Sequence, residues 1–396
     1  MERAAKPDVA VAHPAAGAAV STDELLRRAS LLVPALKERA ARAEQLRQIP
    51  SESVRDLIAS QLVRIGNPAR YGGLGVECDV AYDVAWELGR ACGSTAWCYA
   101  LWTIHNWWLG HFPEAAQEEF FAAGPDTLSS TALNPAGGRA TRVDGGFRVS
   151  GQWSYSSGCD AATWAMVTVP GDGPGAMTWL LLPRTDYEIV DTWFTSGMRG
   201  TGSKDLVVRD VFVPGHRALD PERAGDADLT GWHLHRRTSY RVPLRCLAGW
   251  DLAAPIIGMA QGAIDEFTSR LRGTSGPGRS AESVALQLRL AESAAEVDAA
   301  RALHRHDIRE MLDRATRGDT FTLLDRARYR RDKAFVTRLA VQAVNRVFEA
   351  SGARGVLDAD PMQRFHRDAH GASHHAALTW DPVAEQFGRQ ALGLGP

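Results

Sequence analysis

Residues 149–169 of the chain read Val-Ser-Gly-Gln-Trp-Ser-Tyr-Ser-Ser-Gly-Cys-Asp-Ala-Ala-Thr-Trp-Ala-Met-Val-Thr-Val. A glycine-rich hairpin signal at 144–147 precedes them, and the alternating apolar residues at 164–169 predict a strand. The segment between the two strands is dense in aromatic and small hydroxylated residues, namely Trp153, Tyr155, Ser156, Ser157 and Gly158. Rings offer flat faces, hydroxyls offer hydrogen bonds, and a glycine permits close approach of the backbone. The segment therefore suits a flat aromatic ligand, and an ordinary turn with two serines is the alternative.

Short alternating runs separated by glycine, proline and aspartate extend on both sides of this segment, from about Thr127 to Ala218. They predict a compact β-barrel or sandwich with strands at 127–132, 138–143, 147–155, 165–169, 177–183, 188–192 and 205–214. A polar loop at 197–204 contains three glycines, and backbone amides in such a loop can bind an anion. The chain has no P-loop and no Gly-x-Gly-x-x-Gly unit between a strand and a helix, which argues against a dinucleotide site of the Rossmann type.

Helical periodicity flanks the β region on both sides. A capped helix opens at about Thr22, and further helices are expected after the β region at 252–271, 282–313 and 324–350. Apolar residues in these later helices have heptad-like spacing, which suits a helical bundle that subunits can share. We predict an α+β protein with a disordered tail at 1–20, an N-terminal helical domain at 21–126, a middle β domain at 127–235 and a C-terminal helical bundle at 236–396.

Composition narrows the class of protein. With 45% hydrophobic residues, 23% charged residues and a formal net charge of −2, the chain is typical of globular proteins and shows no preference for nucleic acid or an anionic membrane. No apolar run approaches the ~20 residues of a membrane span, and the N-terminal segment lacks the basic stretch and apolar core of a signal peptide. Five scattered cysteines without a Cys-x-x-Cys pair fit a reducing compartment, so we expect a cytoplasmic protein.

The segment 97–109 is unusually aromatic, with four tryptophans and a histidine within twelve residues. A helix that is apolar on nearly all sides is buried, so His105 is expected to point into the protein. A histidine in this setting is either a hydrogen-bonded core residue or a general base in an aromatic-lined pocket, and the sequence leaves both interpretations open.

Other chemistries have weaker signals. His366, His370 and His374 are spaced by four, so on one helix they share a face that can hold zinc, but no glutamate follows His370 and Gly371 weakens the helix. We therefore predict no metal site. The chain contains no Gly-x-Ser-x-Gly nucleophile elbow for a hydrolase, and no pair of carboxylates stands out for a glycosidase. A helical scaffold that only binds partners would leave the aromatic segment around His105 without an explanation.

The order of these motifs resembles the acyl-CoA dehydrogenase fold over nearly the whole chain, from about residue 22 to 396. Tyr71-Gly72-Gly73-Leu74-Gly75 resembles the loop of that fold's first domain, and residues 149–158 resemble its flavin-contacting strand. The segment 198–205, followed by 210–214, is similar to the part that closes its middle domain. The resemblance implies an N-terminal helical domain, a middle β-barrel or sandwich and a C-terminal four-helix bundle.

Two departures separate the chain from the acyl-CoA dehydrogenases. Where many of those proteins carry a glutamate with Gly-Thr neighbours, which removes an α-proton, this chain has His374-His375 ahead of Trp380-Asp381. The helix expected beside the flavin also carries His105 and its tryptophans. Both features resemble the two-component branch of the fold, whose members are monooxygenases that use reduced flavin. The resemblance favours His375 over His374, because His375 lies five residues before Trp380 as in that branch.

Carried over residue by residue, the resemblance implies three catalytic residues, His105, Ser157 and His375. It assigns cofactor contacts to Tyr155, Ser156, Ser157 and Arg270, the last toward the flavin diphosphate of a neighbouring subunit, and a substrate pocket to Trp102, Trp108 and Trp380. In that branch reduced FAD or FMN reacts with O₂ to give a C4a-hydroperoxide, which a hydroxyl at flavin N5 prolongs and a dry aromatic pocket protects. A histidine that accepts a phenol or indole proton makes the substrate ring more nucleophilic.

The resemblance also implies partners: a separate NAD(P)H:flavin reductase that supplies the reduced flavin, a small aromatic substrate such as a polycyclic phenol, polyketide or indole, and a homotetramer with flavin sites at subunit interfaces. We therefore predict a two-component monooxygenase that hydroxylates an aromatic compound in secondary metabolism or aromatic degradation. N-oxidation of an amino sugar is the alternative within the branch. Acyl-CoA dehydrogenation and a non-catalytic flavin-binding role are the alternatives outside it.

Overall fold

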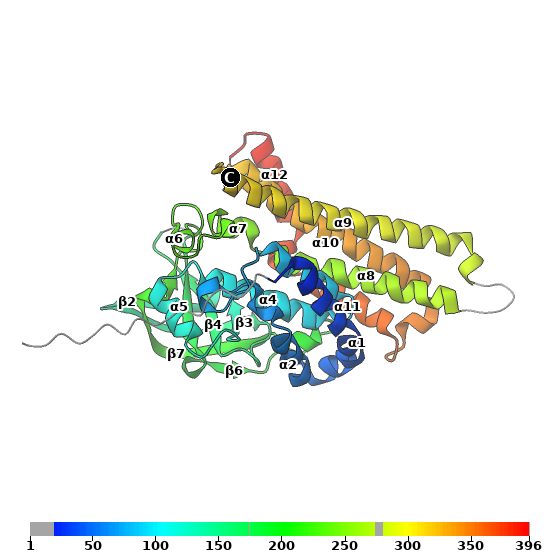
Figure 1. Cartoon of the computed structure of the whole chain (residues 1–396), viewed down its shortest axis with the longest axis horizontal. Helices are drawn as coiled ribbons and strands as arrows, with labels where there is room; N and C mark the ends of the chain where they lie inside the picture. Colours follow the sequence, from blue (N-terminus) through cyan, green and yellow to red (C-terminus); the bar gives the residue numbers. More distant parts are fainter. Residues whose placement is uncertain (1–19, 174, 274–279, 396) are drawn as a thin grey trace, which may run out of the picture.

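The computed structural model describes residues 20–173, 175–273 and 280–395. Within them the chain forms a helical N-terminal part, a β region and a bundle of long C-terminal helices, which follow one another from blue to red in Figure 1. This order confirms the predicted α+β architecture. The predicted tail at 1–20 lies outside the described residues, except for Val20.

The N-terminal part surrounds one very buried helix. It contains α1 (Thr22–Leu46), α2 (Ser51–Ala59), α3 (Asp79–Gly89), α4 (Gly93–Leu109) and α5 (Glu114–Phe121). The α1 helix begins where predicted, because the Ser21 hydroxyl accepts a hydrogen bond from the Glu24 amide at 3.2 Å. In α4 every residue except Leu101 is buried, as its lack of a polar face predicts.

The β region consists of two four-stranded sheets whose buried side chains share one core. One sheet has the order β1 (Ser129–Ala132), β4 (Trp164–Pro170), β5 (Met177–Pro183) and β8 (Ala218–Leu219). The other has the order β2 (Gly138–Val143), β3 (Gly146–Ser156), β7 (Lys204–Pro214) and β6 (Glu188–Val190). Each strand predicted from the sequence is present, with bounds within two residues. The β8 strand escaped prediction because two residues are too few for an alternating pattern.

The β3 strand carries the segment that decides the fold. A tight turn with Gly145 at φ +74° joins β3 to β2, and β7 pairs with its other side. The register between β3 and β7 shifts between Trp153 and Ser156. At this bulge Tyr155 adopts φ +73°, and after the last pair, Ser156 with Lys204, the chain leaves the sheet in a turn.

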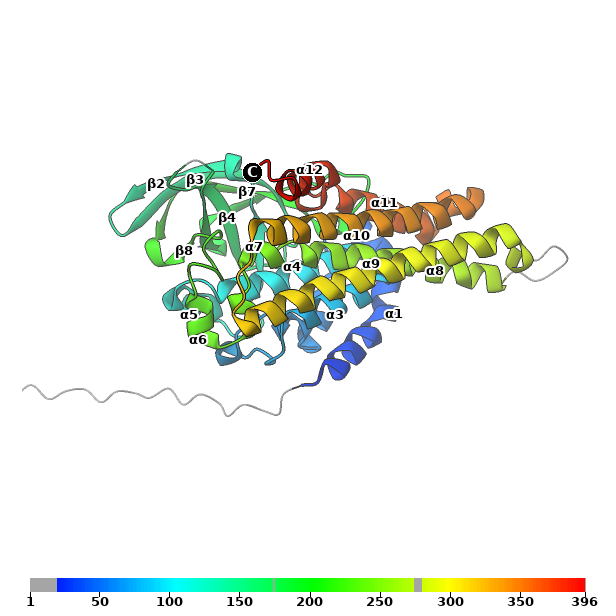
Figure 2. The same ribbon diagram turned by 90° about the horizontal axis from the view of Figure 1, so that it is seen from above.

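The C-terminal part contains α6 (Thr230–His235), α7 (Leu244–Leu247), α8 (Trp250–Gly273), α9 (Val284–Arg317), α10 (Leu323–Ala350), α11 (Pro361–Ser373) and α12 (Trp380–Ala391). Figure 2 shows α8, α9 and α10 side by side as long rods. The α8 helix also packs closely on α3, since a Cβ atom at Gly258 would lie 2.2 Å from the Trp86 carbonyl oxygen. One hydrophobic core therefore spans the N-terminal part and the bundle, and the domain bounds at 126 and 235 stay predictions. Within the described ranges, no helix has both the length and the apolar character that a membrane crossing requires.

Candidate active site

The first group of predicted residues lies on the buried α4 helix and the strand beside it. His105 is fully buried, its Nδ1 atom lies 3.0 Å from the Ser129 carbonyl oxygen, and its Nε2 atom lies 3.1 Å from the Thr131 hydroxyl. A carbonyl oxygen only accepts, so Nδ1 carries the ring proton and the Thr131 hydroxyl donates to Nε2. Burial lowers the pKa of His105 to about 3. The imidazole is therefore a neutral acceptor held in one tautomer.

Trp108 completes this set, termed here the histidine group (His105, Trp108, Ser129 and Thr131). The Trp108 ring lies 4.9 Å from the imidazole and 4.7 Å from the Trp179 ring, measured between centroids. The Trp108 indole nitrogen and the Ser129 hydroxyl are buried and have no hydrogen-bond partner in the described part of the chain. Such unpaired polar atoms are costly, which favours a ligand at this place. His105 is thus a hydrogen-bonded core residue, and its catalytic role stays a prediction.

The second group is the turn at the end of β3. Ser157 is 7% exposed, and its hydroxyl lies 2.7 Å from the Ser203 hydroxyl and 3.3 Å from the Trp97 indole nitrogen. Tyr155 is 69% exposed. The Ser156 hydroxyl is buried and has no partner among the residues that the structure describes. An exposed ring, a hydroxyl without a partner and a second serine thus lie together, which fits the predicted flavin contacts.

Trp102 supports this turn from within the core. Its indole nitrogen donates to the Gly158 carbonyl oxygen at 3.2 Å. Gly158 has φ +69°, and a Cβ atom there would lie 2.6 Å from the same nitrogen. The observed contact of Trp102 is therefore with the backbone of the turn, and its part in a substrate pocket stays a prediction.

His375 lies in the segment between α11 and α12. Its ring is 5.9 Å from that of Trp97, so the indole that binds Ser157 also contacts this histidine. His374 turns away instead, with its Nδ1 atom 2.7 Å from a carbonyl oxygen of the preceding turn of α11. His375 is exposed, yet the protein atoms near its ring and the Lys333 ammonium lower its pKa to about 4. This geometry is consistent with the preference for His375.

Two predicted residues contact other parts of the C-terminal helices. Arg270 on α8 forms ion pairs with Glu266, at 3.2 Å, and with Asp360. Trp380 begins α12 and packs on α10, where its ring lies 5.9 Å from the Phe335 ring. The roles of Arg270 toward the flavin diphosphate and of Trp380 toward the substrate therefore stay predictions.

The three histidines considered for zinc are each engaged with protein. The His366 ring stacks on Phe348 with centroids 4.1 Å apart, and the His370 Nε2 atom lies 2.7 Å from the Asn345 side-chain oxygen. His374 binds the backbone of its own helix. We propose no metal site at these residues.

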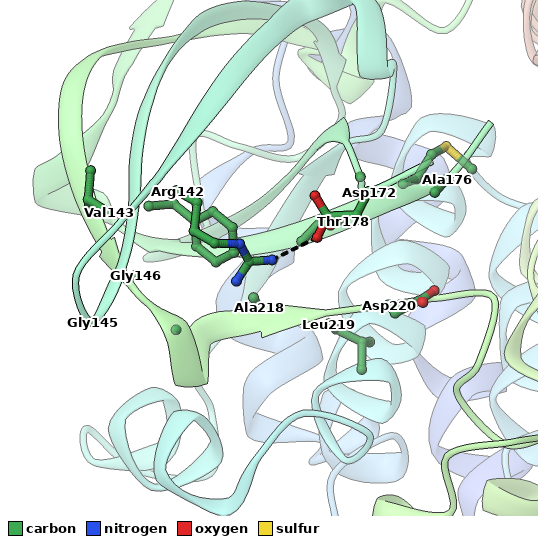
Figure 3. Close-up of a pocket in the computed structure, with 14 residues that line it drawn as sticks. Arg142, Val143, Gly145, Gly146, Asp172, Ala176, Thr178, Ala218, Leu219 and Asp220 are labelled. Atoms are coloured by element: carbon green, nitrogen blue, oxygen red, sulfur yellow. Dashed lines mark hydrogen bonds and ion pairs between the residues drawn. The ribbon is translucent and has the colours of Figure 1, made fainter. Parts of the chain in front are cut away.

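A surface pocket of about 520 Å³ opens at the outer end of the β region, between the β2–β3 and β4–β5 connections. Figure 3 shows Arg142 and Asp172 in this pocket, joined by a dashed line. The Arg142 guanidinium lies 3.0 Å from the Asp172 carboxylate. Both side chains are mostly exposed, so the ion pair contributes little. The residues that line the pocket include no predicted site residue, and we assign it no catalytic role.

Sequence reasoning missed several residues that surround the predicted ones. Thr201 and Ser203 belong to the polar loop expected to bind an anion, yet their hydroxyls point inward, and that of Ser203 meets Ser157. Ser129 and Thr131 were expected only as parts of a strand. The hydroxyl-rich composition of these segments was a signal, but the register of β3 on β7 is needed to bring the two loops together.

Comparison with known proteins shows which family the chain belongs to. Residues 251–380 match the family model described as acyl-CoA dehydrogenase, C-terminal domain. The chain is 36% identical to the oxygenase subunit HsaA of a flavin-dependent monooxygenase from Mycobacterium tuberculosis, over 92% of this chain and 94% of that protein. It is 32% identical to the oxygenase component of an FADH₂-dependent resorcinol hydroxylase from Rhizobium sp., over 94% of this chain and 95% of that protein. The crystal structure of 3-HSA hydroxylase from Rhodococcus sp. RHA1 matches with a TM-score of 0.90 and 33% identity, over 95% of this chain and 98% of that one.

The chain therefore belongs to the oxygenase components of two-component flavin-dependent monooxygenases, which have the acyl-CoA dehydrogenase fold. This confirms the resemblance and the enzyme class predicted from the sequence, and it favours monooxygenation over acyl-CoA dehydrogenation or a non-catalytic role. The turn at 155–158 fits a flavin on its own chemistry, because it presents an exposed aromatic ring beside a buried hydroxyl that lacks a partner in the described ranges.

Proposed function

We propose that the chain hydroxylates a phenol or another electron-rich aromatic compound with O₂ and reduced flavin. The histidine group is the observation that carries this proposal. A neutral imidazole lies against a tilted indole there, beside an N–H group and a serine hydroxyl that lack partners within the described residues. A phenol has an aromatic face and a hydroxyl that both donates and accepts, so it can satisfy these groups together. A relative named for resorcinol, which is a phenol, supports this substrate class.

The observed contacts of the predicted residues suggest a role for each in this reaction. Reduced flavin supplies the oxygen-activating chemistry when it is bound. The His105 Nε2 atom accepts a hydrogen bond from the phenol hydroxyl in place of the Thr131 hydroxyl, which raises the electron density of the substrate ring. Ser157 would hold the flavin at N5, and His375, whose ring also contacts Trp97, would help to orient the bound molecules. The buried aromatic walls exclude water from the reacting atoms.

The proposal extends to cofactor, partner and assembly. We favour FAD over FMN, supported by the FADH₂-dependent relative, and a separate NAD(P)H:flavin reductase, supported by relatives that are oxygenase components. A homotetramer would cover apolar side chains that are exposed on α9, such as Val284 at 66% and Leu288 at 59%. Arg270 would then approach a neighbouring flavin. The cytoplasmic location stays a prediction.

The test is a coupled assay. The purified protein is mixed with FAD, NADH, a flavin reductase and isotopically labelled O₂, together with resorcinol, a polycyclic phenol or indole. We expect a product with one labelled oxygen atom that does not form without the protein. If the reduced flavin is oxidised and O₂ is converted only to hydrogen peroxide with every compound, the proposal is refuted. Anaerobic reduction of bound FAD by an acyl-CoA thioester would instead indicate a dehydrogenase.

A further inference from the structure

A row of buried hydroxyl groups leads from α11 to Ser157. Asp368 on α11 accepts a hydrogen bond from the Met198 amide at 2.6 Å. The Thr201 hydroxyl lies 2.8 Å from the Met198 carbonyl oxygen. It also lies 2.6 Å from the Ser203 hydroxyl, which in turn lies 2.7 Å from the Ser157 hydroxyl. Thr201, Ser203 and Ser157 are termed here the hydroxyl row, and none of them is more than 7% exposed.

Counting protons gives the hydroxyl row a single direction. Each hydroxyl has one proton, and the Met198 carbonyl oxygen can only accept, so the Thr201 proton is directed to that oxygen. Ser203 must then donate to Thr201, and Ser157 must donate to Ser203. The Ser157 oxygen also accepts the Trp97 N–H at 3.3 Å. Ser157 is left with one free lone pair and no free proton.

Backbone contacts hold the hydroxyl row in place. The Gly158 amide donates to the Thr201 carbonyl oxygen at 2.8 Å, which joins the turn after β3 directly to the loop before β7. On the other side the loop packs on α11, since a Cβ atom at Gly197 would lie 2.0 Å from the Arg367 carbonyl oxygen. The loop is thus fixed from both sides, and the direction of its hydroxyl protons is fixed with it.

We propose that Thr201 and Ser203 are positioning residues that make Ser157 a hydrogen-bond acceptor only, and that this selects reduced flavin over oxidised flavin. The selection would act at the N5 atom of the flavin, whose hydrogen-bonding role changes with the redox state. In reduced flavin N5 carries a hydrogen and donates, whereas in oxidised flavin N5 is a bare acceptor. An acceptor at Ser157 can accept a hydrogen bond from N5–H of reduced flavin. With oxidised flavin, the lone pairs of Ser157 and N5 would face each other and repel. The inference rests on the proposed function, because it requires Ser157 to face N5.

The experiment is an anaerobic titration of the full-length protein with FADH₂ and, separately, with FAD, which gives a dissociation constant for each. Thr201→Val and Ser203→Ala interrupt the hydroxyl row and free the Ser157 proton to turn toward the flavin. One neutral hydrogen bond changes an affinity by about three- to tenfold, so the preference for FADH₂ should fall by about that factor. The two-electron midpoint potential of the bound flavin is a second readout, in which tenfold corresponds to about 30 mV.

Two further variants separate positioning from structural damage. Thr201→Ser retains the hydroxyl and should keep the wild-type preference for FADH₂. Thr337→Val removes another buried threonine hydroxyl, which donates to the Lys333 carbonyl oxygen at 2.9 Å in α10, and should also keep it. Circular dichroism and Tm verify folding. Ser203→Ala, which removes a single oxygen atom, decides the question if Thr201→Val does not fold.

The outcomes distinguish this inference from the proposed function. A preference that falls in Ser203→Ala and survives in Thr201→Ser supports the hydroxyl row. A wild-type preference that persists undiminished in Ser203→Ala overturns the row and leaves the proposed function standing. A wild-type protein that binds neither form of the flavin overturns both.

Discussion

The histidine group and the hydroxyl row both lie against α4, but their polar atoms are arranged in opposite ways. In the histidine group the imidazole is paired on both nitrogens, whereas the Trp108 indole and the Ser129 hydroxyl have no partner in the described part of the protein. In the hydroxyl row each proton has an acceptor, and Ser157 keeps one lone pair but no free proton. The histidine group therefore contains polar atoms without partners, whereas the hydroxyl protons of the hydroxyl row all have acceptors and one common direction.

This difference separates two ways in which a buried site prepares for a ligand. Unpaired polar atoms destabilise the empty site, so they favour binding and can adapt to ligands of different shape. A satisfied hydrogen-bond row keeps its geometry and presents one fixed atom. We infer that the histidine group serves the substrate, whose shape differs between relatives, and that the hydroxyl row serves the flavin, which is constant.

The largest expected effect is at His105. In His105→Asn the side-chain N–H can still donate to the Ser129 carbonyl oxygen, but the shorter amide places no acceptor at the position of Nε2. Hydroxylation should fall on the order of 100-fold, because the substrate hydroxyl loses its acceptor at that position. Binding of FADH₂ should stay at the wild-type level. Product formed per turnover at saturating flavin measures the change.

His304 offers a matched control on α9. It is also buried, its Nε2 atom lies 3.1 Å from the Trp250 carbonyl oxygen, and burial lowers its pKa to about 4. His304→Asn should hydroxylate at the wild-type rate per folded protein. Equal losses in the two variants would trace the effect to folding, and full activity of His105→Asn would contradict the role of the histidine group.

The next effect is expected at Ser157. Ser157→Ala removes the acceptor that faces N5, so hydrogen peroxide released per substrate hydroxylated should rise about tenfold. A peroxide assay beside product analysis measures this coupling. Ser293→Ala is the control, since Ser293 is a buried serine that donates to a backbone carbonyl at 3.4 Å within the bundle. Unchanged coupling in Ser157→Ala would count against a flavin contact at this turn.

The sequence predicted the elements of the fold well, because they follow local patterns. Alternation along the chain indicated the strands, and a helix without a polar face indicated that His105 is buried. The hydroxyl row could not be predicted, since Ser157 and Ser203 are 46 positions apart and meet only through the bulged pairing of β3 with β7. Contacts within one element are encoded locally, whereas contacts between loops depend on register.

The partners of Trp102 and Arg270 also escaped sequence reasoning, for the same reason. A pattern shows that a tryptophan is buried, but it does not show that its N–H group binds the Gly158 carbonyl oxygen. The position of Arg270 in a helix does not reveal Asp360, which lies 90 positions away. The sequence therefore predicted the burial and the secondary structure of these residues better than their hydrogen-bond and ion-pair partners.

A smaller effect is expected from the turn itself. Gly158→Ala introduces a Cβ at φ +69° that would lie 2.6 Å from the Trp102 indole nitrogen. We expect the free energy of unfolding to fall by ~1–3 kcal/mol, seen as a lower Tm. Gly75→Ala isolates the backbone strain, because Gly75 has φ +74° and a Cβ atom there would meet no described atom within 4 Å. Equal losses in both variants would show that the contact between the added Cβ atom and Trp102 costs no stability beyond the backbone strain.

The last expected effect is a pH dependence of stability at Asp368, whose carboxylate accepts from the Met198 amide next to the hydroxyl row. Burial raises the pKa of Asp368 from 3.8 to about 6. Between these pH values the native protein keeps a proton that the unfolded chain has lost, so the free energy of unfolding falls as pH rises. Asp368→Asn does not ionise, and its stability relative to wild type should increase from about pH 4 to pH 6 by up to ~3 kcal/mol. Thermal unfolding across this range measures the difference.

Asp251 is a control, because it is a buried carboxyl group with the same direction of pKa shift but no contact with Met198. It is 1% exposed, it accepts from the Gly249 amide at 2.8 Å, and burial raises its pKa to about 6, so Asp251→Asn should show the same pH-dependent gain in Tm. Only Asp368 binds the Met198 amide. An asparagine oxygen still accepts from that amide, so the preference for FADH₂ should persist in Asp368→Asn. Asp368→Ala removes this acceptor and tests whether it holds the Met198 carbonyl oxygen, which orients Thr201, in place. Loss of the preference in Asp368→Asn would mean that the charge of Asp368 is needed to hold the Met198 backbone that orients Thr201.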